Sequence, residues 1–269
     1  MRTVFIFCLI VCLIINFSRA QPTDVKFKRL SVDEGLSQGH VSAIIKDHEG
    51  FMWFATDEGV NKYNGHHFIV YKHDPEKTGS ISSDFVRDLL EDQAGNLWVG
   101  TAGGLDRFDR KKDAFIHYNL SNSAMAVRDI FQDSKNRIWL GTTQGLYLFN
   151  TVTSTFKGYQ HQPTDTNSLS HDFIYRITED TEGDLRIATK EGLNRFNPLT
   201  QRFIHHRYDP RNPRSLSHNT VHSIMEDRQG NLWLGTSGGL NLFDKKTRTF
   251  RTYTERDGLY YLLNDRKIG

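Results

Sequence analysis

A short tryptophan-containing pattern occurs five times along the 269-residue chain, and this repetition limits the possible folds more than any other feature. In its fullest form the pattern is Gly-Asn-Leu-Trp-Val-Gly-Thr at residues 95–101, and a Gly-Leu pair follows two residues later. The tryptophan register falls at residues 53, 98, 139, 186 and 233, and Arg186 is the one member that is not tryptophan. Repeats with a period of about 20–50 residues indicate a solenoid, a propeller or a similar array.

Each copy has the pattern of four short β-strands. The first strand is expected at Val41–Lys46, Val86–Glu91, Val127–Gln132, Ile174–Glu179 and Val221–Glu226. An Asp-x-x-Gly turn follows, which is hairpin chemistry because aspartate bonds its own downstream backbone and glycine accepts a positive φ. The turn glycines are Gly50, Gly95, Gly183 and Gly230. The fourth strand carries an aromatic pair: Phe68/Tyr71, Phe115/Tyr118, Phe156/Tyr159, Phe203/Tyr208 and Phe250/Tyr253.

Four strands in a unit of about 45 residues are typical of a propeller blade. The chain is therefore predicted to be all-β. About five blades are expected, at residues 37–72, 84–119, 125–159, 172–208 and 219–253. We expect residues 27–30 to be a lone fourth strand and residues 254–269 to begin a truncated sixth blade. The array would then be an incomplete ring from a longer, seven-bladed propeller.

The pattern Gly-x-Leu-Trp-x-Gly-Thr-x-x-Gly-Leu resembles the two-component regulator propeller repeat, and the resemblance covers about residues 27–259. That repeat builds the extracytoplasmic sensor region of bacterial hybrid histidine kinases and diguanylate cyclases. Longer family members continue into a further β-domain, a membrane span and a cytoplasmic output domain. The resemblance therefore implies that this chain is the N-terminal fragment of a sensor.

The first 20 residues have the pattern of a secretory signal peptide. A positive start at Arg2 precedes an apolar run at residues 4–17, and small residues precede Gln21. The run is shorter than the about 20 residues that a membrane span needs, so cleavage before Gln21 is favoured over an uncleaved anchor. The mature β-propeller sensor domain, residues 21–269, is expected to be periplasmic or otherwise extracytoplasmic.

Charge and cysteine content exclude several classes of function. The chain has 34 basic and 32 acidic residues, whereas nucleic-acid binding needs a basic excess. Both cysteines, Cys8 and Cys12, lie in the signal peptide, so the mature chain has no disulfide and no thiolate. The 12 histidines have no metal-binding spacing, and no serine lies in a Gly-x-Ser-x-Gly setting. We expect no nucleic acid, no metal, no cofactor and no catalytic residue.

The tryptophans Trp53, Trp98, Trp139 and Trp233 have two interpretations, an aromatic binding row or packing between blades. Recurrence at one register favours packing, because a single asymmetric site does not need it. The Asp-x-x-Gly turns are likewise interpreted as structural turns, because each lacks the run of oxygen ligands that calcium needs.

The best candidates for function are positions that differ between copies at one register. In a propeller the first strand of each blade lines the central channel, so polar residues near its start face a common space. Five and four residues before each turn aspartate, the sequence places the polar candidates Arg87, Asp88, Arg128, Asp129, Tyr175, Arg176 and His222. Such a lining suits a polar or anionic ligand, through charge-assisted and bidentate hydrogen bonds. A wet channel lining without function is the alternative.

Three copies share one long loop before the first strand, and the third copy is shorter at residues 120–126. This difference predicts a notch in the rim that could receive a ligand or partner, beside Arg186.

The leading hypothesis is a non-enzymatic sensor that binds a polar extracellular ligand, with a carbohydrate implied by the resemblance. It would relay binding to an output domain, contact the membrane only through a downstream segment, and possess a homodimeric form in the full-length receptor. A protein-interaction scaffold and a secreted enzyme acting on polysaccharide are the alternatives.

Overall fold

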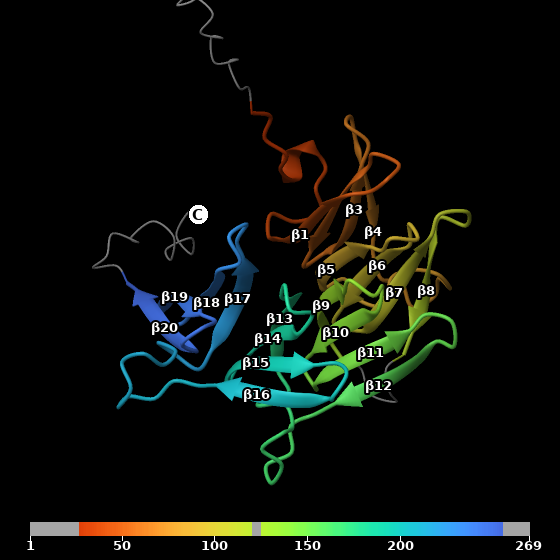
Figure 1. Cartoon of the computed structure of the whole chain (residues 1–269). Coiled ribbons are helices and arrows are strands. Elements are labelled where there is room, and N and C mark those ends of the chain that lie inside the picture. Colours follow the sequence, from red (N-terminus) through yellow and green to blue (C-terminus); the bar gives the residue numbers. More distant parts are fainter. Residues whose placement is uncertain (1–26, 120–124, 255–269) are drawn as a thin grey trace, which may run out of the picture.

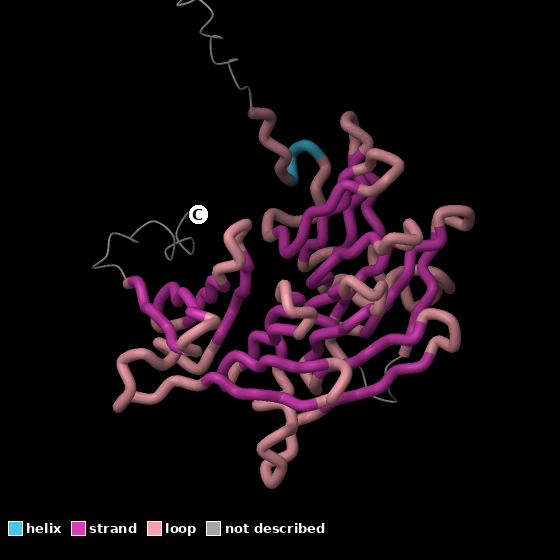
Figure 2. Tube along the Cα trace, viewed as in Figure 1, coloured by secondary structure: helices cyan, strands magenta, loops and turns pink. Residues whose placement is uncertain are grey.

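The computed structural model of the chain describes residues 27–119 and 125–254. Its strands form five antiparallel sheets of four strands each, and in every sheet the strands lie in chain order (Figure 1). The prediction of an all-β propeller with about five four-stranded blades is confirmed. Strands and their connections make up nearly all of the described chain, with one short 3-10 helix, η1 (Val32–Glu34) (Figure 2).

The blades have closely similar strand lengths. Blade one contains β1 (Val41–Lys46), β2 (Met52–Thr56), β3 (Gly59–Tyr63) and β4 (Phe68–Tyr71). Blade two contains β5 (Val86–Glu91), β6 (Leu97–Thr101), β7 (Gly104–Asp109) and β8 (Ala114–Tyr118). Blade three contains β9 (Val127–Gln132), β10 (Ile138–Thr142), β11 (Leu146–Asn150) and β12 (Thr155–Tyr159). Blade four contains β13 (Ile174–Glu179), β14 (Leu185–Thr189), β15 (Gly192–Asn197) and β16 (Arg202–His206). Blade five contains β17 (Val221–Glu226), β18 (Leu232–Thr236), β19 (Gly239–Asp244) and β20 (Thr249–Tyr253).

The blades follow one another in an arc (Figure 1). Each first strand contacts the first strand of the next blade: β1 contacts β5, β5 contacts β9, β9 contacts β13, and β13 contacts β17. The first strands therefore form the inner edge of the arc, and the fourth strands lie at its outer edge. Within the described residues no strand pairing joins blade five to blade one.

In four of the five blades, the turn after the first strand holds the tryptophan of the second strand. In blade two the indole Nε1 of Trp98 donates to a carboxylate oxygen of Asp92 at 2.8 Å. Gly95 completes this turn with a φ of +80°, and Asn136 takes the same place in blade three with a φ of +62°, a conformation that asparagine tolerates. The same indole bond joins Trp53 to Asp47, Trp139 to Asp133, and Trp233 to Asp227.

Each interior indole packs against a phenylalanine of the following blade. The ring centroids are 4.9 Å apart for Trp53 and Phe108, 5.4 Å for Trp98 and Phe149, and 5.7 Å for Trp139 and Phe196. These three indoles are at most 1% exposed. Buried aromatic pairs in offset or edge-on contact add to the burial of apolar area, so this register holds neighbouring blades together.

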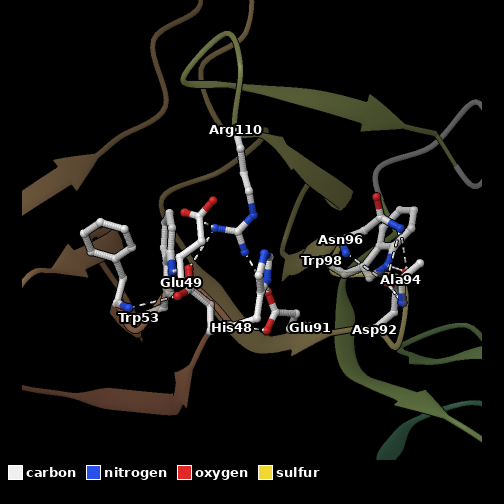
Figure 3. A network of polar contacts seen from close by, with 11 residues as sticks. His48, Glu49, Trp53, Glu91, Asp92, Ala94, Asn96, Trp98 and Arg110 are labelled. Carbon is white, nitrogen blue, oxygen red and sulfur yellow. Dashed lines mark hydrogen bonds and ion pairs between the residues drawn. The ribbon is translucent and has the colours of Figure 1, made fainter.

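A polar contact repeats at the same interfaces. The last residue of a first strand accepts a hydrogen bond from a backbone N–H in the preceding blade's turn, at 2.8 Å for Glu91 and His48 and 2.7 Å for Glu179 and Ser134. Between blades one and two, Arg110 adds ion pairs to Asp47 at 2.8 Å, Glu49 at 3.0 Å and Glu91 at 2.7 Å (Figure 3). One guanidinium thus joins the turn that holds Trp53 to the first strand of blade two.

Two local expectations from the sequence are wrong. Residues 27–30 belong to no strand, because the described residues provide no third strand for them to pair with; they lead into η1 instead. In blade four the aromatic partner of Phe203 is not Tyr208. His206 pairs with Leu193 in the register where Tyr118 pairs with Leu105 in blade two.

Other sequence-based expectations concern residues that lie outside the described part of the chain. These are the signal peptide at residues 1–20, the notch at residues 120–124 and the partial sixth blade at residues 255–269.

Candidate functional site

A β-bulge interrupts the first strand of every blade near its start. In blade two Val86 pairs with Thr101 and Asp88 pairs with Gly100, so Arg87 is an extra residue without a cross-strand partner. The other blades show the same register shift. The five extra residues, which we call the bulge row, are Ser42, Arg87, Arg128, Tyr175 and His222.

A bulge re-aims the side chain of its extra residue and often lies beside a functional site. The bulge row coincides with the positions that the sequence singles out five residues before the turn. Since β1, β5, β9, β13 and β17 form the inner edge of the arc, the row follows that edge from blade to blade.

Arg87 is held by an acid of the preceding blade. Its Nη1 lies 2.9 Å from a carboxylate oxygen of Asp57, in the turn between β2 and β3. His40 Nδ1 lies 3.1 Å from the other oxygen of Asp57. The blade-two end of the bulge row is therefore occupied by an ion pair.

Arg128 has aromatic rather than acidic neighbours. Its guanidinium carbon lies 4.5 Å from the ring centroid of Phe173 and 5.3 Å from that of Tyr175. Its Nε is buried and has no hydrogen-bond partner. Burial lowers the pKa of Arg128 from its ordinary value, and the positive charge of Arg87 lowers it further. Lys190 shares the same ring, with its Nζ 4.2 Å from the centroid of Phe173.

The row continues into blade five through ring contacts. Tyr175 lies edge-on to His222, with centroids 4.9 Å apart, and it also contacts Phe173 at 4.9 Å. His222 Nε2 is 2.9 Å from the Ser237 hydroxyl. Arg128, Tyr175 and His222 are therefore brought together by three neighbouring blades.

The residues directly after Arg87 and Arg128 are the buried acids Asp88 and Asp129, which bond to the next blade. Asp88 and Asp129 are 8% and 1% exposed, and each accepts a hydrogen bond from a backbone N–H of the next blade, Ile130 at 2.8 Å and Ile177 at 2.6 Å. Arg176 Nη1 lies 2.9 Å from Asp129. These carboxylates join consecutive first strands beneath the bulge row.

Burial dominates the protonation of both acids. It raises the pKa of Asp88 to about 6, and together with the nearby Asp88 charge it raises the pKa of Asp129 to about 8. Arg176 opposes this rise at both acids.

Sequence reasoning did not find Phe173, Lys190 or Asp57. The missed signal is a second variable register, the residue directly after the repeated threonine of the second strand. Its members are Asp57, Ala102, Thr143, Lys190 and Ser237. Asp57 and Ser237 contact the bulge row directly, and Lys190 does so through Phe173.

Residues 27–119 and 125–254 contain no group of three or more His, Cys, Asp or Glu side chains placed to hold a metal ion. In the same ranges, no helix has the length and apolar character required to cross a membrane.

Four segments of the sequence match the family described as Two component regulator propeller, at residues 35–58, 80–103, 121–144 and 215–238. In each of blades one, two, three and five, the matched segment reaches from the loop before the first strand to the turn after the second. Blade four is the blade with Arg186 at the tryptophan register.

Solved structures and a curated relative agree with these matches. The extracellular domain of the putative hybrid two component system BT3049 from B. thetaiotaomicron is 27% identical, with a TM-score of 0.73 over 84% of this chain and 32% of that chain. Histidine kinase P4 from Formosa agariphila is 37% identical over 83 residues, which are 30% of this chain and 6% of the kinase. The present chain therefore spans about a third of the BT3049 chain and a small part of the kinase.

A virginiamycin B lyase from Staphylococcus aureus has a TM-score of 0.60 at 13% identity, over 80% of this chain and 69% of the lyase. At that identity the likeness concerns the fold alone. The repeated matches and the BT3049 structure point to the same family from sequence and from architecture. The chain therefore contains four repeats of the Two component regulator propeller type, and its fold resembles that of the BT3049 extracellular domain.

Proposed function

We propose that this chain is the extracytoplasmic ligand-sensing propeller of a bacterial signalling receptor, and that the bulge row contacts the ligand. The observation that carries the proposal is the contrast between registers. The tryptophan that packs against the next blade recurs in four of the five blades, whereas the bulge row contains four different residue types in five blades, with arginine in both blade two and blade three. Structural packing requires repetition, and selective recognition of an asymmetric molecule requires difference.

The comparisons support the signalling part of this proposal. The BT3049 structure is an extracellular domain of a hybrid two component system, and it resembles this chain over most of the chain's length. By this analogy, binding at the propeller would bias the packing of two receptor chains and so regulate a kinase or cyclase output domain. The chain itself would not be an enzyme.

The binding role is tested by calorimetric titration of the purified chain with a panel of neutral and acidic mono- and oligosaccharides. We expect saturable binding of at least one saccharide of the panel. Tyr175→Ala should weaken this binding about tenfold or more, because the Tyr175 ring contacts both Arg128 and His222 of the bulge row. Tyr208→Ala is the matched control, because Tyr208 is exposed outside the row. Equal losses in the two variants would contradict a binding role for the row.

Export is the second testable part. We expect the signal peptide to be removed so that Gln21 is the mature N-terminus, because small residues precede it and the apolar run before them is short. Intact-mass measurement of the protein recovered from the periplasm checks this. A membrane-bound product that retains Met1 would show that the segment is an anchor.

A further inference from the structure

Arg128 is a partly buried arginine of the bulge row that has no acidic partner among the described residues. Six arginines each lie within 3.0 Å of a carboxylate oxygen: Arg87, Arg110, Arg137, Arg176, Arg186 and Arg195. Arg128 instead stacks on Phe173 and Tyr175, and its buried Nε donates to no acceptor.

An unpaired, partly desolvated guanidinium is unfavourable. A buried polar group that makes no hydrogen bond retains its desolvation cost, and the cost is larger when the group is charged. Contact with two ring faces returns part of that free energy, because the aromatic quadrupole attracts a cation. Stacking uses only the faces of the guanidinium, so it leaves the in-plane N–H donors without acceptors, and of these the Nε–H is buried.

The charges around Arg128 favour an incoming anion. The positive charge of Arg87, which is ion-paired with Asp57, lowers the pKa of Arg128. The Nζ of Lys190 lies 4.2 Å from the ring centroid of Phe173, the ring that Arg128 also contacts. The adjacent acid in sequence, Asp129, is 1% exposed and already bound to Arg176 and to the Ile177 backbone. The site therefore has cations at its surface and no free carboxylate among its described neighbours.

The aromatic residues add a surface for a ring-shaped ligand. Phe173 and Tyr175 are only partly buried, and Tyr175 extends the surface to His222. A sugar ring presents C–H groups that pack on such faces, while a carboxylate or sulfate on the ring meets the planar guanidinium edge.

We propose that Arg128, Phe173, Tyr175 and Lys190 form a binding site for an acidic saccharide, with its carboxylate or sulfate on the Arg128 guanidinium. The site rests on the proposed sensing function and narrows it to a ligand class. Bidentate pairing with the anion would supply the partner that Arg128 lacks.

The test follows the Arg128 Nε–H signal by nitrogen-15 NMR in the purified chain, with the signal assigned from its absence in Arg128→Gln. The probes are galacturonate, sodium sulfate and, as the neutral counterpart, galactose. We expect saturable shifts of this signal with galacturonate and sulfate. Galacturonate affinity should fall about tenfold or more in Arg128→Gln, the factor for losing one charge-assisted contact.

Arg202→Gln is the matched control, because Arg202 is exposed on the outer strand of blade four. It should leave galacturonate affinity unchanged. Thermal melting of Arg128→Gln and Arg202→Gln establishes that both variants are folded. A third variant, Arg128→Lys, keeps the positive charge without the planar guanidinium. It should bind galacturonate more weakly than the parent chain and more tightly than Arg128→Gln.

The acidic-ligand inference is overturned if neither anion gives a saturable shift, or if Arg128→Gln binds galacturonate as tightly as the parent chain does. Binding of neutral saccharides that depends on Tyr175 but not on Arg128 would also overturn it, while leaving the sensing function intact. Loss of all saccharide binding from the panel would instead remove the proposed function.

Discussion

At the scale of single residues, Arg186 shows what the tryptophan register requires. Its side chain is 2% exposed, its Nε donates to Asp180 at 2.8 Å, and its Nη2 lies 2.7 Å from the same carboxylate oxygen. Its guanidinium also lies 5.6 Å from the ring of Phe243 in blade five. The arginine therefore supplies both functions of an indole, an N–H for the turn aspartate and a flat face for the next blade.

Two substitutions of Arg186 test the contribution of these contacts to stability. Arg186→Leu should lower the free energy of unfolding by about 3–5 kcal/mol, because it leaves the buried Asp180 without its ion-pair partner. Arg186→Trp restores the residue of the sibling blades, and we expect it to raise stability by about 1 kcal/mol. Urea denaturation of the two variants measures both changes. If Arg186→Leu were as stable as the parent chain, the buried ion pair would have no structural role.

His206 makes the stability of blade four depend on pH. Burial, followed by the charges of Arg186 and Arg248, lowers its pKa to about 4 from an ordinary value near 6.5. Between these values the unfolded chain binds more protons than the folded chain, so the contribution to stability is complete above about pH 6.5 and is lost as the pH falls toward 4.

The substitution His206→Tyr should remove the contribution of His206 to the pH dependence of the free energy of unfolding. Tyrosine should fit this position, since it stands at the same register in the other blades. Urea midpoints of the two proteins at pH 7.5 and 5 provide the comparison, because carboxylate titration is common to both. His117→Gln is a control of opposite sign. The hydrogen bond to Asp106 raises the pKa of His117, so its contribution is present below about pH 6.5 and is lost at higher pH. Parallel pH profiles for His206→Tyr and the parent would rule out the role of His206.

At the scale of strands, much of the fold follows from the sequence. All five first strands have the predicted bounds, because alternating residues end at an Asp-x-x-Gly turn, or at Asp-x-x-Asn in blade three, that stops each strand at a defined place. The bulge could not be predicted, since it is a property of the pairing between two strands and has no residue signature of its own here. For the same reason, the repeat spacing identified Arg87 and Arg128 as candidates but did not reveal their neighbours. Arg87 pairs with Asp57, whereas Arg128 contacts the rings of Phe173 and Tyr175.

The blade-four aromatic pair shows a second limit. The sequence predicts Tyr208 as the second aromatic residue of the pair. The strand pairing places His206 at this register instead, and its ring contacts Phe243 and Phe250. An imidazole kept neutral by burial packs as an aromatic ring, and residue type alone does not reveal its protonation.

The tryptophans of blades two and five provide a comparison at the level of the blade interface. Trp98→Ala should cost about 3–5 kcal/mol, because the indole is buried against Phe149 and bonded to Asp92. Trp233→Ala should cost at least about 1 kcal/mol less, since the indole is partly exposed and its ring partner in the described chain is Tyr253 of its own blade. Urea melts of both variants measure the difference. Equal costs would mean that the indole's contacts within its own blade, rather than those with the next blade, determine its contribution.

At the scale of the whole molecule, the blades form a linear series in which each contacts mainly its neighbours. Stability in such an array is approximately a sum of unit and interface contributions. Blades two, three and four each have two described interfaces, whereas blades one and five each have one. This arrangement predicts that the end blades open locally at lower free energy than the middle ones.

Hydrogen exchange measured by mass spectrometry tests this gradient on the native chain. We expect the backbone amides of β18 and β19 to exchange faster than those of β6, β7, β10 and β11. These strands occupy equivalent places in their blades, so the difference would report the number of described blade interfaces rather than strand position. Arg186→Leu, which weakens the contact between blades four and five, should accelerate exchange in blade five and leave blade two unchanged. Uniform acceleration across all five blades would show instead that the array unfolds as a single cooperative unit, in which a ligand bound at the bulge row would stabilise every blade equally.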